Sequence, residues 1–261
     1  MHQLGAHNPR IDRVRSLRTK KGRREQRRFA FEGLTLLEEA LRSTVSIEEV
    51  YTRPDRLNAY HVRALVAHNV PIYTVDERTM KKLSDLETPP GVLAVAPIVM
   101  SPLASIFSGD GVVLVLAGLS DPGNAGTLLR AAEAFGARGV VFGTNSVDPH
   151  SPKVMRSAMG SPFRLPLAIA GPQETAGAAT GWDRSGLAAG GLPIAGVGWG
   201  KKELLVVGQE RHGLGDWEPL CTRKVTIPMA GQVESLNAAL AGAIALYEAS
   251  RRARNGLVKR V

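Results

Sequence analysis

Hydrophobic and polar positions alternate along the chain with two periods, one typical of strands and the other typical of helices. In the first 98 residues, apolar or β-branched runs predict strands at 47–51, 71–75 and 91–96, and helical spacing predicts helices at 34–41, 55–68 and 76–83. Strands that alternate with helices over about 65 residues are typical of a compact α/β unit. We therefore predict a small α/β domain in this part of the chain.

A second and stronger pattern begins after residues 97–111, where Pro97, Pro102 and Gly109 break the periodicity. We interpret residues 99–110 as a linker. The continuous apolar run at 112–116 is typical of a strand buried on both faces of a parallel sheet. Further strands are predicted at 140–143, 204–207 and 225–227, and helices at 125–135, 152–159 and 235–252, whereas the Gly- and Ala-rich residues 170–200 predict no element. The sequence thus predicts an α/β fold in two domains, 1–98 and 111–261, the second with a parallel sheet.

Composition excludes several classes of protein. Of the 261 residues, 44% are hydrophobic and 22% are charged, which is typical of a globular chain. No apolar run reaches the ~18 residues of a membrane span, and the first thirty residues lack the apolar segment of a secretory signal. The single cysteine excludes an internal disulfide, and the six histidines lack the spacing of a metal site. We expect a soluble, cytoplasmic protein without a metal.

Positive charge is concentrated at the start of the chain. Residues 1–30 carry ten Lys and Arg against two acidic residues, a net charge of +8 out of the total of +9. Such a cluster attracts phosphates, so residues 1–30 are interpreted as a basic arm that binds nucleic acid; a solvated basic tail is the alternative. The candidate nucleic-acid-binding residues, which become RNA-binding residues under the family resemblance described below, are Arg10, Arg18, Lys20, Lys21, Arg23, Arg24, Arg27 and Arg28. Binding to a membrane surface is disfavoured because the segment has too few large apolar residues.

Polar residues follow three predicted strands, at the positions where ligands usually bind in open α/β sheets. The first junction, 120–126, leads into a helix that carries Arg130, and Asn124 is a candidate cap of that helix. The alternative is that this junction has a structural role only, in which case Asn124 simply caps the helix and Arg130 pairs with Glu133. The second junction, 208–213, places Glu210 between two glycines. By itself it would usually be an ordinary turn, and it lacks both the P-loop and the dinucleotide-binding glycine pattern, so an NAD-linked or nucleotide-linked enzyme is poorly supported.

The third junction, 227–237, leads into the last predicted helix. Ser235 is a candidate cap of that helix, whereas Asn237 would lie in its first turn, where asparagine is mildly unfavourable. The helix carries a stripe of Leu236, Leu240, Ile244 and Tyr247, and small residues occupy most of its other positions. A helix that is apolar all round is either central in the core or covered by a second protomer, and we expect a homodimer.

Taken together, the three junctions resemble in order and spacing the three motifs of the SpoU (TrmH-type) RNA 2′-O-ribose methyltransferases of the SPOUT superfamily. Residues 121–126 with Arg130 resemble the first motif, 205–210 with Gly213 the second, and 227–229 with 233–237 the third. Residues 151–161 also resemble a segment of this family. The N-terminal part, with residues 31–33 and 91–95, is similar to the substrate-binding domain that many members carry.

This resemblance implies a deep trefoil knot that holds S-adenosylmethionine, and a transfer of its methyl group to a ribose 2′-hydroxyl. The implied cofactor-binding residues are Gly208, Ile227, Met229 and Leu236, and the implied catalytic residues are Asn124, Arg130, Glu210, Ser235 and Asn237. A guanidinium stays protonated and is a poor base, so we expect Arg130 to orient the hydroxyl and the adjacent phosphate. The N-terminal domain favours large-subunit ribosomal RNA as substrate; transfer RNA is the alternative substrate, and a non-catalytic RNA-binding protein is the alternative function.

Overall fold

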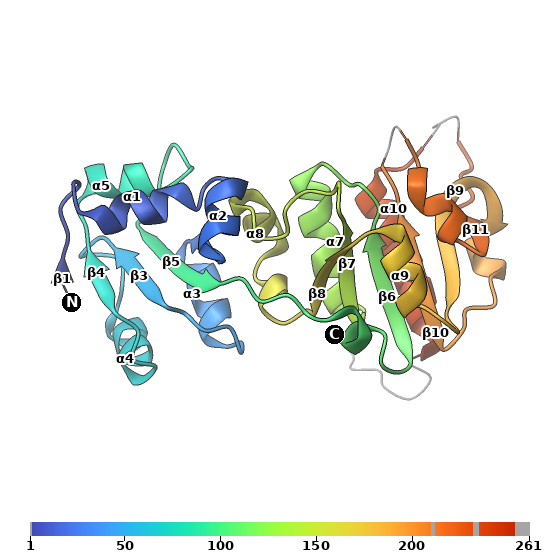
Figure 1. Ribbon diagram of the computed structural model, residues 1–261, viewed down its shortest axis with the longest axis horizontal. Helices are drawn as coiled ribbons and strands as arrows, with labels where there is room; N and C mark the ends of the chain where they lie inside the picture. Colours follow the sequence, from blue (N-terminus) through green and yellow to red (C-terminus); the bar gives the residue numbers. More distant parts are fainter. Residues whose placement is uncertain (1, 210–211, 232–234, 254–261) are drawn as a thin grey trace. The chain divides into compact units, whose positions relative to one another are not determined.

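The computed structural model describes residues 2–209, 212–231 and 235–253. The chain forms two compact units (Figure 1). Unit 1 comprises residues 1–99 and 148–164, and unit 2 comprises residues 100–147 and 165–261. The two units therefore differ from the predicted domains, because residues 148–164 pack with unit 1 although they lie within the range 111–261. The predicted α/β class is confirmed, whereas the trefoil knot stays a prediction.

Unit 1 is built on a mixed five-stranded sheet with the order β1-β4-β3-β5-β2. Its strands are β1 (His2–Gln3), β2 (Arg28–Glu32), β3 (Glu49–Thr52), β4 (Ile72–Thr74) and β5 (Val92–Pro97). Its helices are α1 (Pro9–Ser16), α2 (Lys20–Gln26), α3 (Leu34–Leu41), α4 (Ala59–Ala67), α5 (Glu77–Leu83) and α8 (Pro152–Ala158). Strand β5 pairs antiparallel with β2 and β3, so β2 is an edge strand of the sheet. The sequence pattern did not predict β2.

The basic N-terminal segment is folded, which corrects its interpretation as an arm. Asn8 and Thr19 cap α1 and α2 by accepting hydrogen bonds from backbone N–H groups in the first turn of each helix. Ile11, Val14 and Leu17 are buried against the sheet. Their spacing of three places them on one face of α1 and the turn after it, and the many intervening charges hide this apolar face in the sequence.

Arg23 joins α2 to residues 148–164. Its side chain is 4% exposed and donates through Nε and Nη2 to Oδ2 of Asp148, at 2.8 and 2.6 Å. Nη1 of Arg23 donates to the backbone carbonyls of Leu17 and Arg18 at 2.8 and 3.0 Å. All these acceptors lie within unit 1, so the guanidinium nitrogens of Arg23 are engaged in hydrogen bonds that stabilise the fold. This finding corrects the assignment of Arg23 to the RNA-binding set.

A second clamp on residues 148–164 is formed by Arg156 of α8. Its Nη1 lies 3.3 Å from Oε1 of Glu32 and 2.7 Å from Oδ1 of Asp85. Burial and the neighbouring carboxyl of Asp85 raise the pKa of Glu32 to about 7. Met155 and Phe163 of the same segment are buried in the apolar core of unit 1. The segment is therefore an integral part of that core.

Unit 2 is built on a six-stranded sheet with the order β11-β9-β10-β6-β7-β8, and all its strand pairs are parallel. The strands are β6 (Gly111–Leu116), β7 (Gly139–Gly143), β8 (Leu167–Ala170), β9 (Asp183–Pro193), β10 (Lys202–Val207) and β11 (Arg223–Thr226). The helices are α6 (Leu103–Ile106), α7 (Pro122–Ala134), α9 (Pro172–Ala178) and α10 (Ala238–Ala253), with the short 3-10 helix η3 (Gly215–Leu220). Helix α10 packs against α7, β6 and β10, so these two helices share one face of the sheet.

The predicted linker is packed for much of its length. Ile106 and Phe107 are buried in the core of unit 2, together with strand residues such as Val113 and Val115. Arg138 donates to the backbone carbonyls of Ile106, Ser108 and Asp110, at 3.1, 3.1 and 3.3 Å. The proline and glycine residues of this stretch break periodicity without preventing burial.

In the part of the chain that the structure describes, no helix is both long and apolar enough to cross a membrane.

Candidate active site

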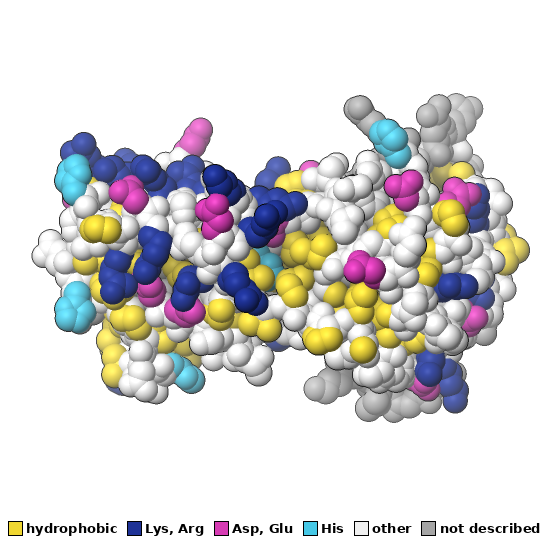
Figure 2. Space-filling model, in the orientation of Figure 1, with side chains coloured by type: hydrophobic (Ala, Val, Ile, Leu, Met, Phe, Trp, Pro, Cys, Tyr) yellow, Lys and Arg dark blue, Asp and Glu magenta, His cyan; other side chains and the backbone are white. Residues whose placement is uncertain are grey.

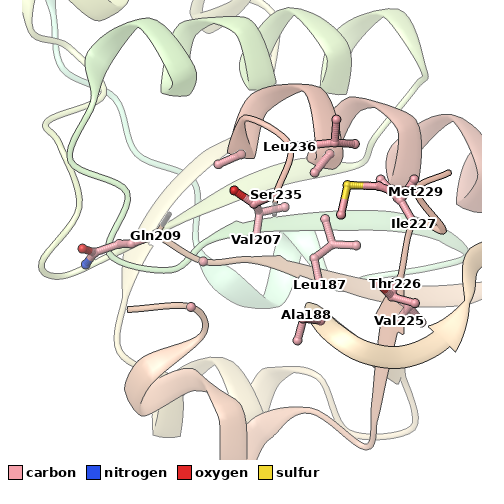
Figure 3. Close-up of a pocket in the computed structure, with 15 residues that line it drawn as sticks. Leu187, Ala188, Val207, Gln209, Val225, Thr226, Ile227, Met229, Ser235 and Leu236 are labelled. Atoms are coloured by element: carbon pink, nitrogen blue, oxygen red, sulfur yellow. The ribbon is translucent and has the colours of Figure 1, made fainter. Parts of the chain in front are cut away.

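A pocket of about 330 Å³ lies in unit 2, where the segments after β10 and β11 meet the beginning of α10 (Figure 3). Its lining residues are Leu187, Ala188, Ala189, Val207, Gly208, Gln209, Gly213, Val225, Thr226, Ile227, Met229, Ser235, Leu236, Ala238 and Ala241. No side chain in this lining is charged among the residues that the structure describes. The pocket is therefore suited to an apolar, flat group held by backbone polar atoms and is unsuited to a phosphate.

The second and third junctions of the sequence converge on this pocket. Gly208 follows β10, and Ile227 and Met229 follow β11, as the sequence predicts. Ser235 and Leu236 complete the wall just before α10. All four residues proposed to bind the cofactor line the pocket, together with one of the proposed catalytic residues.

The first junction reaches the same region through a hydrogen bond between two asparagines. Nδ2 of Asn237 donates to Oδ1 of Asn124 at 3.0 Å. Oδ1 of Asn237 accepts from the backbone N–H groups of Ala239 and Leu240, at 2.9 and 3.3 Å. Asn237 is therefore the cap of α10, which begins at Ala238. The predictions that Ser235 caps this helix and that Asn237 lies inside its first turn are wrong.

The cap of α7 also differs from the prediction. Oδ1 of Asp121 accepts from the backbone N–H of Asn124 at 2.7 Å, and Pro122 occupies the first helical position. Because Asp121 caps the helix, the side chain of Asn124 is left to bond Asn237. The bond between the two asparagines joins the starts of α7 and α10.

Arg130 and Glu210 are not among the residues that line the pocket. Arg130 lies six residues beyond Asn124 on α7, about 9 Å further along the helix axis. Its side chain is exposed and forms neither an ion pair nor a hydrogen bond with another described residue, so the structure does not support the pairing with Glu133. Glu210 lies outside the described residues. In the described ranges, no group of three or more His, Cys, Asp or Glu could hold a metal ion.

Sequence reasoning missed the wall that β9 contributes. Lys224 of β11 pairs with Gly186, but the next residue, Val225, pairs with Leu192, so residues 187–191 form a bulge. Leu187, Ala188 and Ala189 of this bulge line the pocket. A Cβ on Gly191 would lie 2.6 Å from the backbone of Lys224, which explains why glycine is required there. The adjacent glycines 190 and 191 were the available signal, inside a region to which the sequence assigned no element.

The proposed RNA-binding residues of unit 1 fall into three groups. Arg23 is buried. Arg10, Lys21 and Arg28 have ion-pair partners, in Glu49, Glu25 and Glu48 respectively. Arg18, Lys20, Arg24 and Arg27 are exposed and have no ion pair with another described residue. Figure 2 shows the Lys and Arg side chains gathered over α1 and α2.

Helix α10 has one packed side and one exposed side. Gly242, Ala245 and Ala249 face inward, and a Cβ on Gly242 would lie 2.5 Å from Leu128 of α7. Leu240, Ile244 and Tyr247 are 56%, 41% and 50% exposed. The small residues therefore allow close packing within unit 2, and the large apolar stripe is left uncovered in one chain.

Two family models match this chain. The SpoU rRNA Methylase family matches residues 111–247, just over half of the chain, and the MRM3-like substrate binding domain matches residues 8–94. The chain belongs to the SpoU methylase family. The resemblance found in the sequence motifs is thereby confirmed, and the candidate site lies within the matched SpoU region.

Individual SpoU relatives match almost the whole chain. The 23S rRNA (guanosine(2553)-2′-O)-methyltransferase RlmP of Bacillus subtilis is 30% identical, over 93% of this chain and 96% of its own length. The crystal structure of an AdoMet-bound rRNA methyltransferase from Sinorhizobium meliloti has a TM-score of 0.86 at 28% identity, over 96% of this chain and 97% of that chain. The SpoU methyltransferase AviRb from Streptomyces viridochromogenes, in complex with AdoMet, has a TM-score of 0.83 at 28% identity, over 96% and 100% of the two chains.

Proposed function

We propose that this SpoU family member methylates a ribose 2′-hydroxyl of large-subunit ribosomal RNA in the cytoplasm, with S-adenosylmethionine as methyl donor. The observation that carries the proposal is the convergence of the second and third motifs on one pocket whose described lining residues carry no charged side chain, tied to the first motif by the Asn124–Asn237 hydrogen bond. Relatives that match nearly the whole chain are rRNA methyltransferases by name, which favours ribosomal over transfer RNA.

The pocket fits the proposed cofactor in size and chemistry. Its volume of about 330 Å³ is in the range of small-molecule sites, and Leu187, Ile227 and Leu236 provide apolar contacts for an adenosyl group. Because Gly208 has no side chain, the cofactor can approach the backbone after β10 closely. When bound, S-adenosylmethionine supplies a methyl group that the adjoining sulfonium charge already activates.

The role of the protein is then to align the hydroxyl and to stabilise its oxygen as its proton passes to the adjacent phosphate or to water. Asn124 and Asn237 lie at the starts of α7 and α10, where the helix dipoles favour negative charge. Arg130 would orient the hydroxyl and its neighbouring phosphate, since a guanidinium is a donor and a poor base. In-line positioning of this kind can lower a barrier by up to ~7–11 kcal/mol. In this proposal Glu210 and Ser235 are further polar groups of the site.

Methyl transfer from tritium-labelled S-adenosylmethionine tests the proposed function. The purified protein is incubated separately with unmodified 23S ribosomal RNA and with transfer RNA, and the labelled nucleotide is mapped. We expect label on a ribose of the ribosomal RNA. Label on transfer RNA alone would favour the alternative substrate, and binding without any transfer would indicate a non-catalytic RNA-binding protein.

Gly208→Ala is expected to weaken S-adenosylmethionine binding by at least about tenfold. A Cβ at this position would lie 2.0 Å from the carbonyl oxygen of Gly213, and the backbone of Gly213 is held by two 2.9 Å hydrogen bonds with the backbone of Gln209. The backbone must therefore move. Calorimetric titration measures the affinity, with Gly196→Ala as control, because a Cβ there meets nothing within 4 Å. Equal affinities for the two variants would contradict the assignment of the pocket.

Four of the predicted RNA-binding residues, all exposed and without an ion pair to another described residue, are proposed to contact RNA phosphates. Replacing Arg18, Lys20, Arg24 and Arg27 by alanine is expected to weaken RNA binding and to flatten its salt dependence. The reason is that a protein that contacts fewer phosphates releases fewer counterions when it binds. Fluorescence anisotropy with a ribosomal RNA fragment, at several salt concentrations, gives the slope. An unchanged slope would leave these residues with a solubilising role only.

We further propose that the exposed stripe of α10 forms a homodimer. Leu240, Ile244 and Tyr247 would be buried by a second copy of the chain, as exposed apolar patches of this kind mark interaction sites. Light scattering is expected to show a dimer for the unaltered chain and a monomer for Leu240→Glu. A monomer at micromolar concentration in both cases would rule out this interface.

A further inference from the structure

A second hollow, of about 270 Å³, opens beside the first at the carboxyl edge of the unit 2 sheet. It is lined by residues that follow β6, β7, β8 and β10 and by the start of η3, namely Ala117, Gly118, Thr144, Asn145, Pro172, Gln209, His212, Gly213, Leu214, Gly215, Asp216 and Trp217. Gln209 and Gly213 line both hollows. The carboxyl ends of adjacent parallel strands are where ligands bind in open α/β sheets.

The polar side chains of this second hollow are not used by the fold. Thr144, Asn145, Gln209, His212 and Asp216 carry hydrogen-bonding groups, and none of these side chains bonds another described residue. Gln209 is half-buried, and the other four are exposed. Neither Lys nor Arg occurs among the described lining residues, and Asp216 adds a negative charge, so the hollow is unsuited to a phosphate. Its neutral amides suit a ligand with both donors and acceptors.

Gln209 stands between the two hollows. Gly118 has a φ of +69°, and a Cβ there would lie 2.6 Å from Nε2 of Gln209, so the amide lies directly over the backbone after β6. Figure 3 shows the Gln209 side chain pointing away from Leu187, Ser235 and Met229 of the first pocket. The backbone of Gln209 therefore belongs to the methyl-donor pocket, and its side chain is directed to the second hollow.

We propose that the second hollow takes the base of the nucleotide whose ribose is methylated and that it selects a base with an exocyclic amino group. This inference rests on the proposed function, because base and ribose belong to one nucleotide and must occupy neighbouring sites. Amide side chains bind base edges, and a base that is to be read in this way is turned out of its stack. The carboxylate of Asp216 only accepts hydrogen bonds, so it requires N–H donors on the base.

The Asp216 carboxylate distinguishes among the four RNA bases. Adenine, cytosine and guanine each present an amino group, whereas uracil presents a single N–H between two carbonyl oxygens that a carboxylate repels. Asn145 and Gln209 offer a donor and an acceptor each and accept any of the four. Asp216 is thus the residue expected to exclude uridine.

The experiment measures kcat/KM for methyl transfer to an RNA fragment that carries the mapped target nucleotide, and to versions with each other base at that position. Three proteins are compared: the unaltered chain, Asp216→Asn, and Asp110→Asn, which makes the same charge change at the amino edge of β6 and serves as control. We expect the unaltered chain and the control to disfavour uridine by at least about tenfold. Asp216→Asn should lower kcat/KM on the preferred base about tenfold and should reduce the discrimination against uridine to about threefold or less, because an amide offers a donor as well.

Several outcomes separate this inference from the proposed function. Absence of methyl transfer to any RNA would contradict the proposed function itself. Methyl transfer to a mapped uridine, or an unchanged base preference in Asp216→Asn, would overturn the base pocket while leaving methylation in place. The affinity for S-adenosylmethionine is measured in parallel, and a loss of more than about fivefold in Asp216→Asn would assign the hollow to the cofactor instead.

Discussion

Replacing Arg130 by alanine is expected to lower the rate of methyl transfer at least about a hundredfold, with the affinity for S-adenosylmethionine nearly unchanged. The side chain lies outside the pocket lining, so its loss should leave the cofactor in place. It is exposed and unpaired among the described residues, so its loss should cost little stability. What the variant lacks is the donor that would orient the ribose hydroxyl and the phosphate. Initial rates of tritium transfer and calorimetric titration measure the two effects separately.

Two further variants sharpen the Arg130 experiment. Arg130→Lys keeps the charge but loses the planar fork of donors, and we expect it to recover only part of the rate. Lys201→Ala removes an exposed cation next to the amino end of β10 and should be as active as the unaltered chain. Near-normal transfer by Arg130→Ala would remove this residue from the site.

Arg23→Ala is expected to destabilise unit 1 by about 3–5 kcal/mol. The substitution leaves the carboxylate of Asp148, 14% exposed, without its cation, and leaves the carbonyls of Leu17 and Arg18 without these donors. A buried charge that loses its partner carries the full cost of desolvation. Urea denaturation followed by far-ultraviolet circular dichroism gives the free energy of unfolding.

Arg24→Ala is the matched control for this measurement. Arg24 lies next to Arg23 in α2, but its side chain is exposed and has no ion pair with another described residue. Its loss should change the free energy of unfolding by less than about 0.5 kcal/mol. If the two variants were equally stable, the bonds of Arg23 would contribute nothing to the fold, and its assignment to RNA binding would be open again.

The central strands of unit 2 were predictable because their predicted apolar runs, 112–116 and 204–207, are uninterrupted by charge. The runs around Val113 and Leu204 belong to strands buried on both faces, and no helix pattern competes with them. Helix α1 was not predictable in the same way, since Ile11 and Val14 are single apolar positions among arginines and carry the whole burial signal. Net charge described the composition of this segment correctly but said nothing of its packing.

For the candidate site, the sequence predicted the loops and missed the bulge. Loop residues such as Gly208 and Ile227 follow strands that are easy to recognise, so their convergence follows from parallel topology. Leu187 and Ala188 contribute through a shift in strand register between β9 and β11, and register depends on pairing that a single strand does not encode. Asn237 illustrates a third case, because a residue that is unfavourable inside a helix is favourable as its cap.

Because residues 148–164 belong to unit 1, dividing the chain near residue 99 separates side chains of one apolar core. A fragment that ends near residue 99 would lack Met155 and Phe163, two side chains from the interior of unit 1. A fragment that starts near residue 100 would carry those same side chains without the aromatic neighbours Phe29 and Phe31. Neither half is self-sufficient, so exchanging the N-terminal module between relatives requires transplanting two separate stretches of sequence together.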